Sequence, residues 1–278
     1  MKNQPAFDKR PLRDKLHDLS RILKSHAPLL IAYSGGVDST FLLNEAAREL
    51  GNGALGIIAD SPSLPRRALA EALQNARNFG AKVEVIGTNE LSDPRYSSNP
   101  LNRCYFCKFE LFRKMQDVAS ERGFAALAYG ENADDALRFR PGATAAVEFQ
   151  VVAPLRSAGL TKTEIRSMSR ERGLPTADMP AQPCLSSRIP HGTPVTRTAL
   201  LMIENAEEFI RSLGFSVFRV RFIANSEREK PDAKLQVAME EMAKLGALQS
   251  KIRAGLRAIG FRETTIDSDG YRPPPVVR

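Results

Sequence analysis

The stretch that decides the fold is Leu29–Ser39, which reads LLIAYSGGVDS. Its first five residues, Leu29–Tyr33, are a short apolar run of the kind that forms a strand buried in a parallel sheet. A glycine pair follows at once, and a helix is predicted from Thr40 to Leu50, where Gly51 ends it. Strand, glycine turn and helix in direct succession predict a parallel α/β fold with a ligand site at the carboxyl end of the strand.

Strands and helices also alternate on either side of this stretch. The apolar patterns predict helices at 11–26, 65–79 and 105–122, and strands at 54–59, 82–86 and 125–129. This alternation favours a doubly wound parallel sheet with helices on both faces. Thr161 and Glu164 form a capping box that opens a further helix, which Gly173 ends.

The remainder of the chain predicts a long loop and a second, smaller unit. Residues 174–195 contain five prolines, which exclude a regular helix. Beyond that loop we expect an α+β domain, with the first domain at 1–195, the second at 196–278, and a loose Pro-rich tail at the end. Its expected elements are helices at 196–213 and 238–259 and strands at 217–222, 233–237 and 261–266.

Composition narrows the class of protein. No apolar run reaches the roughly 18 residues of a membrane span, and the N-terminus has no secretory apolar region, so we predict a cytoplasmic protein without membrane contact. Three cysteines, an odd number, argue against a disulfide scaffold. The net charge of +8 suits anionic partners such as nucleotides or nucleic acid.

The loop after the first strand has the chemistry of a phosphate site. Its glycines let backbone N–H groups approach an anion closely, and the helix N-terminus adds positive potential. Asp38 suits a Mg²⁺ ligand beside the phosphates. No lysine follows the glycines, so the loop is not a Walker A motif. The residues predicted to bind ATP here are Ser34, Gly35, Gly36, Val37, Asp38, Ser39 and Thr40.

The three cysteines allow four interpretations. Cys104 and Cys107 form a C-x-x-C at the start of a predicted helix, and Cys184 lies in the proline-rich loop. The first interpretation is that the thiols are buried and inert, and the second is that they bind zinc together with His191. The third is a redox-active dithiol with a third thiol that resolves it, and the fourth is a [4Fe-4S] cluster bound by the three thiolates. We favour the cluster, because its open iron can carry an extra sulfide that suits sulfur transfer.

Charged residues elsewhere supply further candidates. Arg219 and Arg221 alternate on a predicted strand and so share one face, which suits a phosphate. Arg188, beside Cys184, is a second anion-binding candidate. Glu207 is a candidate for Mg²⁺ or substrate. Asp134 and Asp135 are candidates for Mg²⁺ or a ribose.

The loop Ser34–Ser39 resembles that of the PP-loop ATP pyrophosphatase superfamily, whose fold is of the adenine nucleotide α-hydrolase type. Members cleave ATP between the α- and β-phosphates. The resemblance narrows to LarE-type ATP-dependent sulfur transferases through Ala59–Arg67, Asn99–Lys108 and Asn132–Asp135, and above all Cys184–Pro194. The match runs from about residue 10 to 272.

The LarE resemblance implies a substrate and roles for residues. The substrate is pyridinium-3,5-biscarboxylic acid mononucleotide, whose carboxylates are adenylated and then converted to thiocarboxylates during nickel-pincer cofactor biosynthesis. A homo-oligomer is also implied. The implied catalytic residues are Cys184, Cys104, Cys107 and Asp38; Ser61 joins the ATP site, and the substrate-binding residues are Arg103, Arg188, Glu207, Arg219 and Arg221.

Some features leave alternatives open. Some family members sacrifice the sulfur of the cysteine matching Cys184, whereas those with all three thiols resemble cluster enzymes. Glu131 stands where a small hydroxyl residue is usual, and the segment after Arg221 lacks a usual histidine. Rival functions are a tRNA-thiolating enzyme, a non-catalytic adenine-nucleotide-binding protein and an ammonia-using synthetase.

Overall fold

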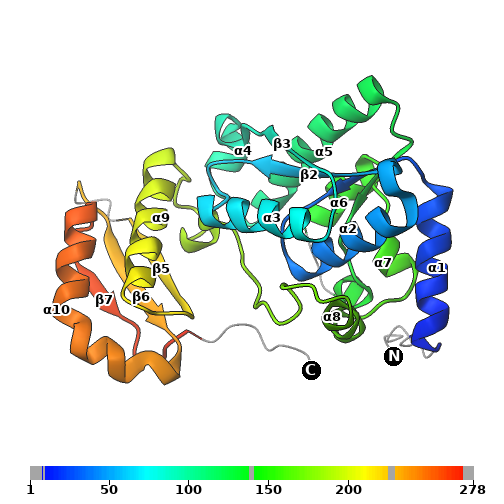
Figure 1. Cartoon of the computed structure of the whole chain (residues 1–278). Helices are drawn as coiled ribbons and strands as arrows, with labels where there is room; N and C mark the ends of the chain where they lie inside the picture. Colours follow the sequence, from blue (N-terminus) through cyan, green and yellow to red (C-terminus); the bar gives the residue numbers. More distant parts are fainter. Residues whose placement is uncertain (1–7, 9, 138–140, 225–228, 272–278) are drawn as a thin grey trace, which may run out of the picture.

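The computed structural model describes the chain except for residues 1–7, 9, 138–140, 225–228 and 272–278. Two sheets organise the described residues, a four-stranded sheet in the first part of the chain and a three-stranded sheet in the second (Figure 1). The predicted Pro-rich tail lies largely outside the described residues.

The larger sheet is parallel throughout. It consists of β1 (Leu29–Ala32), β2 (Ala54–Asp60), β3 (Val83–Gly87) and β4 (Ala126–Tyr129), in the order β3-β2-β1-β4. All four strands were predicted to within one residue at each end. The chain moves outward from β1 to β3 and then returns to the other side of β1, so the strand order reverses between β1 and β4. Ligands bind at such reversals.

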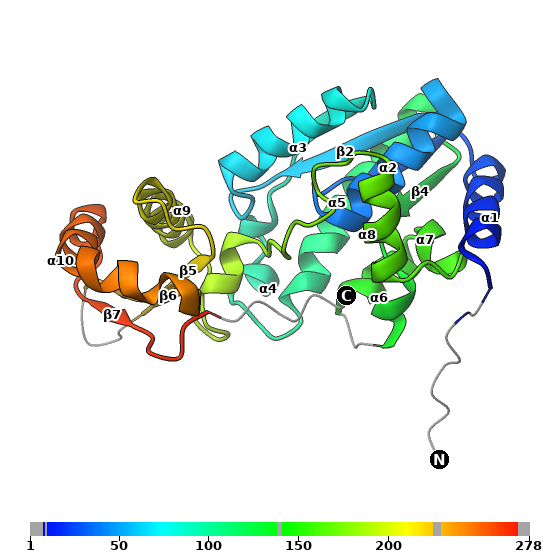
Figure 2. The ribbon, with the colours of Figure 1, turned by 60° about the horizontal axis from the view of Figure 1, so that its bottom comes forward.

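Helices cover both faces of this sheet, as the alternation predicted (Figure 2). Leu29 and Ile31 face a core built with α1, α2, α3 and α8, whereas Leu30 faces α5 and α6. The helices of this part are α1 (Leu12–Ser25), α2 (Val37–Leu50), α3 (Arg66–Asn78), α4 (Pro94–Ser97), α5 (Arg103–Arg122), α6 (Pro141–Glu148), α7 (Pro154–Ser157) and α8 (Lys162–Glu171). The doubly wound α/β fold is confirmed.

The second sheet joins β5 (Phe218–Ile223) and β6 (Asp232–Val237) antiparallel, and β6 and β7 (Thr264–Ile266) parallel. Helices α9 (Arg197–Ser212) and α10 (Met242–Ile259) pack on it (Figure 1). A smaller α+β unit is therefore confirmed. The boundary between residues 195 and 196 stays a prediction, and the apolar cluster of Val195, Ala199 and Leu200 with Tyr96 crosses it.

Three predicted element bounds were wrong by three residues or more. Helix α2 begins at Val37 rather than Thr40, because Gly36 already serves as its N-cap. Helix α10 begins at Met242 rather than 238, because Met239–Glu241 forms a 3-10 turn. The last strand covers only the end of the predicted range 261–266. The loop at 174–195 is confirmed, apart from a 3-10 turn at Leu185–Arg188.

No helix within the described ranges is long and apolar enough to cross a membrane. The cytoplasmic location stays a prediction.

Candidate functional site

The glycine loop joins the end of β1 to the start of α2, and serine hydroxyls hold its shape. The hydroxyls of Ser34 and Ser39 lie 3.0 Å apart, and the Ser39 hydroxyl donates to the Gly36 carbonyl (3.1 Å). Gly35 has φ +74°, a conformation that favours glycine. The loop therefore presents its backbone and the N-terminus of α2 in the geometry expected of an anion site.

Gly130, directly after β4, makes room for this loop. A Cβ at this position would lie 2.7 Å from the backbone nitrogen of Ser39 and 2.9 Å from its Cα. The pairing of β1 with β4 brings the two segments together across about a third of the chain. Sequence reasoning missed Gly130, although a glycine directly after a predicted strand was the available signal.

A lysine reaches the loop from a distant helix. Lys162 Nζ donates to both carboxylate oxygens of Asp38, at 2.8 and 2.7 Å. Lys162 is the first residue of α8, where the predicted capping box of Thr161 and Glu164 is confirmed. Its backbone N–H also donates to Asp134 (2.7 Å). Sequence reasoning assigned no role to Lys162.

A cavity of about 800 Å³ opens over this loop. It lies at the carboxyl ends of β1, β2 and β4, where the strand-order reversal predicted a ligand site. Its wall includes Cys107 and Cys184, so two of the three thiols share it with the loop. Predicted site residues on its wall are Ser34, Gly36, Val37, Asp38, Ser39, Ser61, Cys107, Asp134, Asp135, Cys184 and Arg219.

The thiols differ in exposure. Cys104 is exposed, and Cys107 and Cys184 are partly buried. Burial raises the pKa of the Cys107 thiol, and the nearby carboxylate of Glu90 and the other two thiols raise this pKa further. Cys107 and Cys184 thus line one cavity although they are 77 residues apart, and Cys104 lies one helical turn before Cys107 on α5.

The donor set tests the metal hypotheses. Among the residues that the structure describes, no three His, Cys, Asp or Glu side chains are arranged to hold a metal ion. His191 Nδ1 lies 3.4 Å from the Asn99 carbonyl oxygen. Three thiolates are ligands of the kind that a cluster with one open iron takes, and the cluster stays a prediction.

Asn99 and Arg103 join the two cysteine segments. The Asn99 amide donates to the carbonyls of Pro190 and Thr193, both at 2.8 Å. Arg103 donates to the Ser186 carbonyl (3.0 Å) and to the Asn99 side chain. Both residues are buried. These contacts hold the start of α5, with its C-x-x-C, against the loop that carries Cys184.

Three buried hydroxyls reinforce the same junction. The hydroxyls of Ser63, Tyr96 and Ser186 lie 2.7 to 2.8 Å from one another. The Leu185 N–H also donates to the Ser63 carbonyl (2.9 Å). Burial raises the pKa of Tyr96, so its phenol remains a neutral hydrogen-bonding group. Sequence reasoning missed this cluster, because its members lie on three separate segments.

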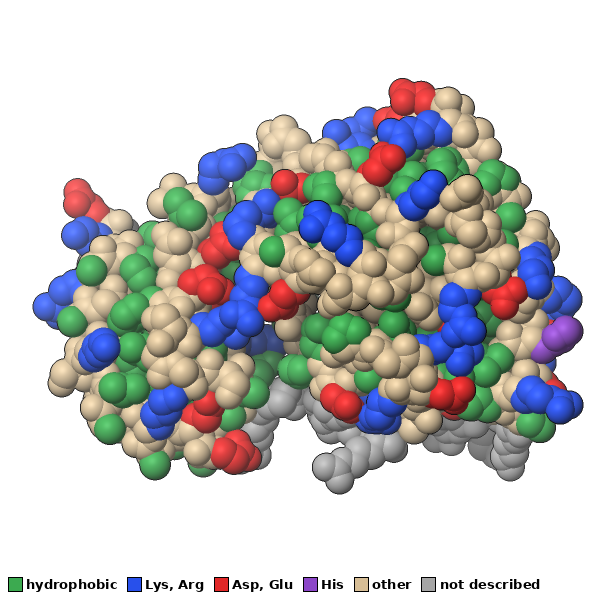
Figure 3. Space-filling model, viewed as in Figure 1, with side chains coloured by type: hydrophobic (Ala, Val, Ile, Leu, Met, Phe, Trp, Pro, Cys, Tyr) green, Lys and Arg blue, Asp and Glu red, His purple; other side chains and the backbone are tan. Residues whose placement is uncertain are grey.

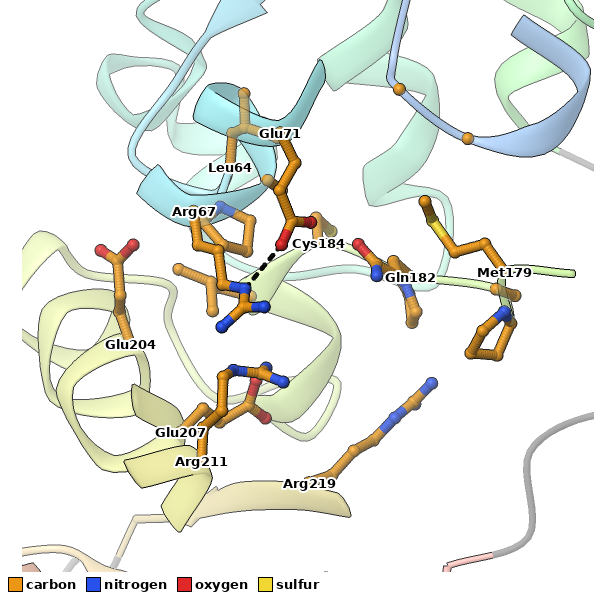
Figure 4. Close-up of a pocket in the computed structure, with 18 of the residues that line it drawn as sticks. Leu64, Arg67, Glu71, Met179, Gln182, Cys184, Glu204, Glu207, Arg211 and Arg219 are labelled. Atoms are coloured by element: carbon orange, nitrogen blue, oxygen red, sulfur yellow. Dashed lines mark hydrogen bonds and ion pairs between the residues drawn. The ribbon is translucent and has the colours of Figure 1, made fainter. Parts of the chain in front are cut away.

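A second cavity of about 380 Å³ lies between α3, α9 and β5 (Figure 4). Charged side chains of both signs point into it, including Arg67, Glu204, Arg211 and Arg219. Figure 3 shows basic and acidic side chains side by side around the hollow between the two units. The segment from Met179 to Cys184 and the side chain of Arg219 line both cavities. Cys184 therefore lies on a wall that the two cavities share.

The candidate arginines have different surroundings. Arg188 forms a bidentate pair with Glu207, at 2.9 Å for each bond. Arg221 donates to the Gln236 side chain (2.7 Å) and to the Ser187 carbonyl (3.2 Å). The Arg219 guanidinium lies over the Tyr271 ring, 4.4 Å from its centre, and burial lowers its pKa. Of the three, Arg219 faces both cavities.

Comparisons with known proteins decide the family. The chain is 30% identical to the pyridinium-3,5-bisthiocarboxylic acid mononucleotide synthase of Lactiplantibacillus plantarum, over 94% of this chain and 93% of that protein. The chain belongs to the LarE family of ATP-dependent sulfurtransferases. The chain is also 40% identical to an uncharacterised protein of Synechocystis, over 94% of this chain and 96% of that protein.

More distant similarity reaches beyond the LarE family. Argininosuccinate synthase of Methanococcoides burtonii is 26% identical over 55% of this chain and 42% of that enzyme. The scan against protein-family models found no match. The resemblance stated from sequence is confirmed at the level of the LarE family, and the three-cysteine subtype stays a prediction.

Glu131, which the sequence resemblance marks as an unusual residue at this position, is paired inside the protein. It accepts a hydrogen bond from the Tyr129 hydroxyl (2.6 Å) and forms an ion pair with Arg156 (2.7 Å). Burial, together with this hydrogen bond, raises the pKa of Tyr129. These contacts explain how an acidic residue is tolerated at a buried position.

Proposed function

We propose that this protein adenylates the ring carboxylates of pyridinium-3,5-biscarboxylic acid mononucleotide with ATP and then converts them to thiocarboxylates. The product name of the Lactiplantibacillus relative supports this substrate. The observation that carries the proposal is the position of Cys184 on the wall that the larger and the smaller cavity share.

The two cavities suit the two reactants. ATP binds in the larger cavity, with its phosphates at the loop Ser34–Thr40 and Mg²⁺ near Asp38. The pyridinium nucleotide binds in the smaller cavity, where the positive charge of Arg219 and Arg211 suits its phosphate. The carboxylate of the pyridinium nucleotide then meets the α-phosphate of ATP where the two cavities adjoin.

The reaction follows from the poor reactivity of a carboxylate. A carboxylate oxygen attacks the α-phosphorus, the bond to the bridging oxygen breaks, and pyrophosphate leaves. A sulfur nucleophile then attacks the carbonyl carbon of the acyl adenylate, and AMP leaves with the bonding electron pair. Both ring carboxylates react in turn.

We further propose that Cys104, Cys107 and Cys184 hold a [4Fe-4S] cluster, which would supply sulfide at its open iron. Anaerobic purification is then expected to give a brown protein with about four irons per chain. Changing Cys104 to Ala should remove the colour and the iron. A colourless wild-type protein whose Cys184 loses one sulfur per turnover would overturn this part.

One assay tests the whole proposal. The protein is incubated with ATP and either the pyridinium dicarboxylate nucleotide or bulk tRNA, and pyrophosphate release is measured. We expect release only with the pyridinium nucleotide, together with the product mass of an oxygen-to-sulfur exchange. Stimulation by tRNA alone would support a tRNA-thiolating enzyme instead.

On the face shown in Figure 3, Lys and Arg mix with acidic residues and form no continuous basic patch.

A further inference from the structure

The glycine loop lacks the lysine that a P-loop carries in its own sequence. The structure supplies one from α8, because Lys162 Nζ lies within hydrogen-bond distance of both Asp38 oxygens. Lys162 also lines the larger cavity. A lysine that contacts a predicted phosphate loop and faces its cavity is placed to contact the phosphates themselves.

Charge in the cavity explains why the lysine is held there. Asp38, Asp134 and Asp135 bring three carboxylates to the wall of a site that must accept a triphosphate. Lys162 contacts Asp38 through its ammonium group and Asp134 through its backbone N–H, which lowers the repulsion that an incoming anion meets. The Lys162 and Asp38 side chains keep 26% and 18% of their surface exposed, so the flexible ammonium has room to move.

The other cations on the described part of this cavity wall are Arg219, Arg166 and Lys108, and the Arg219 guanidinium lies over the Tyr271 ring. Arg166 donates to the carbonyls of Ala177 and Met179, which fixes the start of the proline-rich loop. Lys108 lies over the Tyr129 ring, 4.6 Å from its centre. The Lys162 ammonium, by contrast, contacts the glycine loop itself at Asp38.

We propose that Lys162 binds the β- and γ-phosphates of ATP and the pyrophosphate that leaves, and that Asp38 holds this lysine at the loop until the nucleotide enters. The inference rests on the proposed function. In the reaction the bridging oxygen gains negative charge as its bond to the α-phosphorus breaks. The ammonium of Lys162 stabilises that charge, and its proton stays on the lysine.

Binding measurements without divalent metal test this role apart from catalysis. Dissociation constants of ATP, pyrophosphate and AMP are measured by calorimetry in EDTA for the wild type, Lys162→Met and Lys162→Arg. In Lys162→Met we expect ATP and pyrophosphate to bind about 10- to 100-fold more weakly, the effect of one charge-assisted hydrogen bond. AMP has neither phosphate and should keep its affinity. Lys162→Arg should recover part of the loss.

Arg170→Met is the matched control, because Arg170 lies on the same helix and pairs with Asp178 at the surface. This variant should bind all three ligands like the wild type. An equal loss for AMP and ATP in Lys162→Met would show a structural role and overturn the inference, as would unchanged affinity for pyrophosphate. The proposed function is judged separately, from pyrophosphate release by the wild type with the pyridinium nucleotide.

Discussion

The pair of Arg188 and Glu207 gives the sharpest test of how the Cys184 loop is held. Both bonds of the pair measure 2.9 Å, and the side chains are only 9% and 8% exposed. Glu207 also accepts the backbone N–H of Val220 in β5 (3.2 Å). Arg188 donates further to the carbonyls of Pro183 and Cys184. One carboxylate on α9 thus links β5 to the loop that carries the thiol.

Glu207→Ala should therefore destabilise the protein strongly. It leaves a buried guanidinium without its counter-charge, which typically costs about 3–5 kcal/mol. The carbonyls that Arg188 keeps as partners place the expected loss near the lower end, about 3 kcal/mol. Glu208 is the matched control, because its pair with Arg211 is long (3.4 Å) and its side chain is 48% exposed. Glu208→Ala should lose less than about 0.5 kcal/mol.

Urea unfolding followed by circular dichroism measures both variants against the wild type. The double variant Arg188→Met/Glu207→Leu should regain most of the loss, because it removes both charges together. If Glu207→Ala proved as stable as Glu208→Ala, the buried pair would not hold the loop, and the reasoning would be refuted. Near wild-type stability with a raised KM for the pyridinium nucleotide would instead assign Glu207 to substrate binding.

Three further predictions concern the loop and the thiols. Gly130→Ala should weaken ATP binding about tenfold or more in equilibrium dialysis, because the added Cβ would lie 2.7 Å from the Ser39 backbone nitrogen. Gly87→Ala is the control and should bind ATP normally, because a Cβ at Gly87 would have no atom within 4 Å. Asn99→Ala removes the hydrogen bonds to the Pro190 and Thr193 carbonyls, so it should lower the free energy of unfolding by about 1–3 kcal/mol and abolish thiocarboxylate formation. The affinity for ATP should be unchanged, and a loss of ATP affinity would contradict this prediction. In the metal-free protein, iodoacetamide should label the exposed Cys104 faster than Cys107. The raised pKa of Cys107 delays its labelling until the pH exceeds the usual thiol pKa of about 8.5. Equal labelling rates of the two cysteines, measured by peptide mass spectrometry, would contradict this prediction.

The sequence predicted the parts of the fold that local patterns determine. Apolar runs located β1, β2 and β4 because a strand buried on both faces must be apolar along most of its length, whereas the edge strand β3 is only partly buried and contains Glu84. The capping box at Thr161 marked the start of α8, since both of its hydrogen bonds lie within one turn. The glycine pair after β1 likewise predicted the loop, and Gly35 has a φ of +74°, which few other residues adopt.

Contacts between distant segments were not predictable in the same way. The pairing of Lys162 with Asp38 spans 124 residues and depends on where α8 packs against the sheet. Gly130 meets Ser39 only because β4 pairs with β1 rather than with β3. Periodicity reports which face of an element is buried but not which element covers it. Residues that act through tertiary contacts were therefore missed.

The shared wall between the two cavities also bears on the order of the proposed reaction. Arg219 lines both cavities, although it belongs to the second sheet. A nucleotide held by Arg219 in the smaller cavity would place its carboxylate near the wall formed by Met179–Cys184, which also borders the ATP cavity. Adenylation and sulfur delivery then act on the same carboxylate without its moving between distant sites. In the proposed reaction the proline-rich loop would couple the two steps, because it contributes to both cavities, and its five prolines suit this role by limiting the conformations that it can adopt.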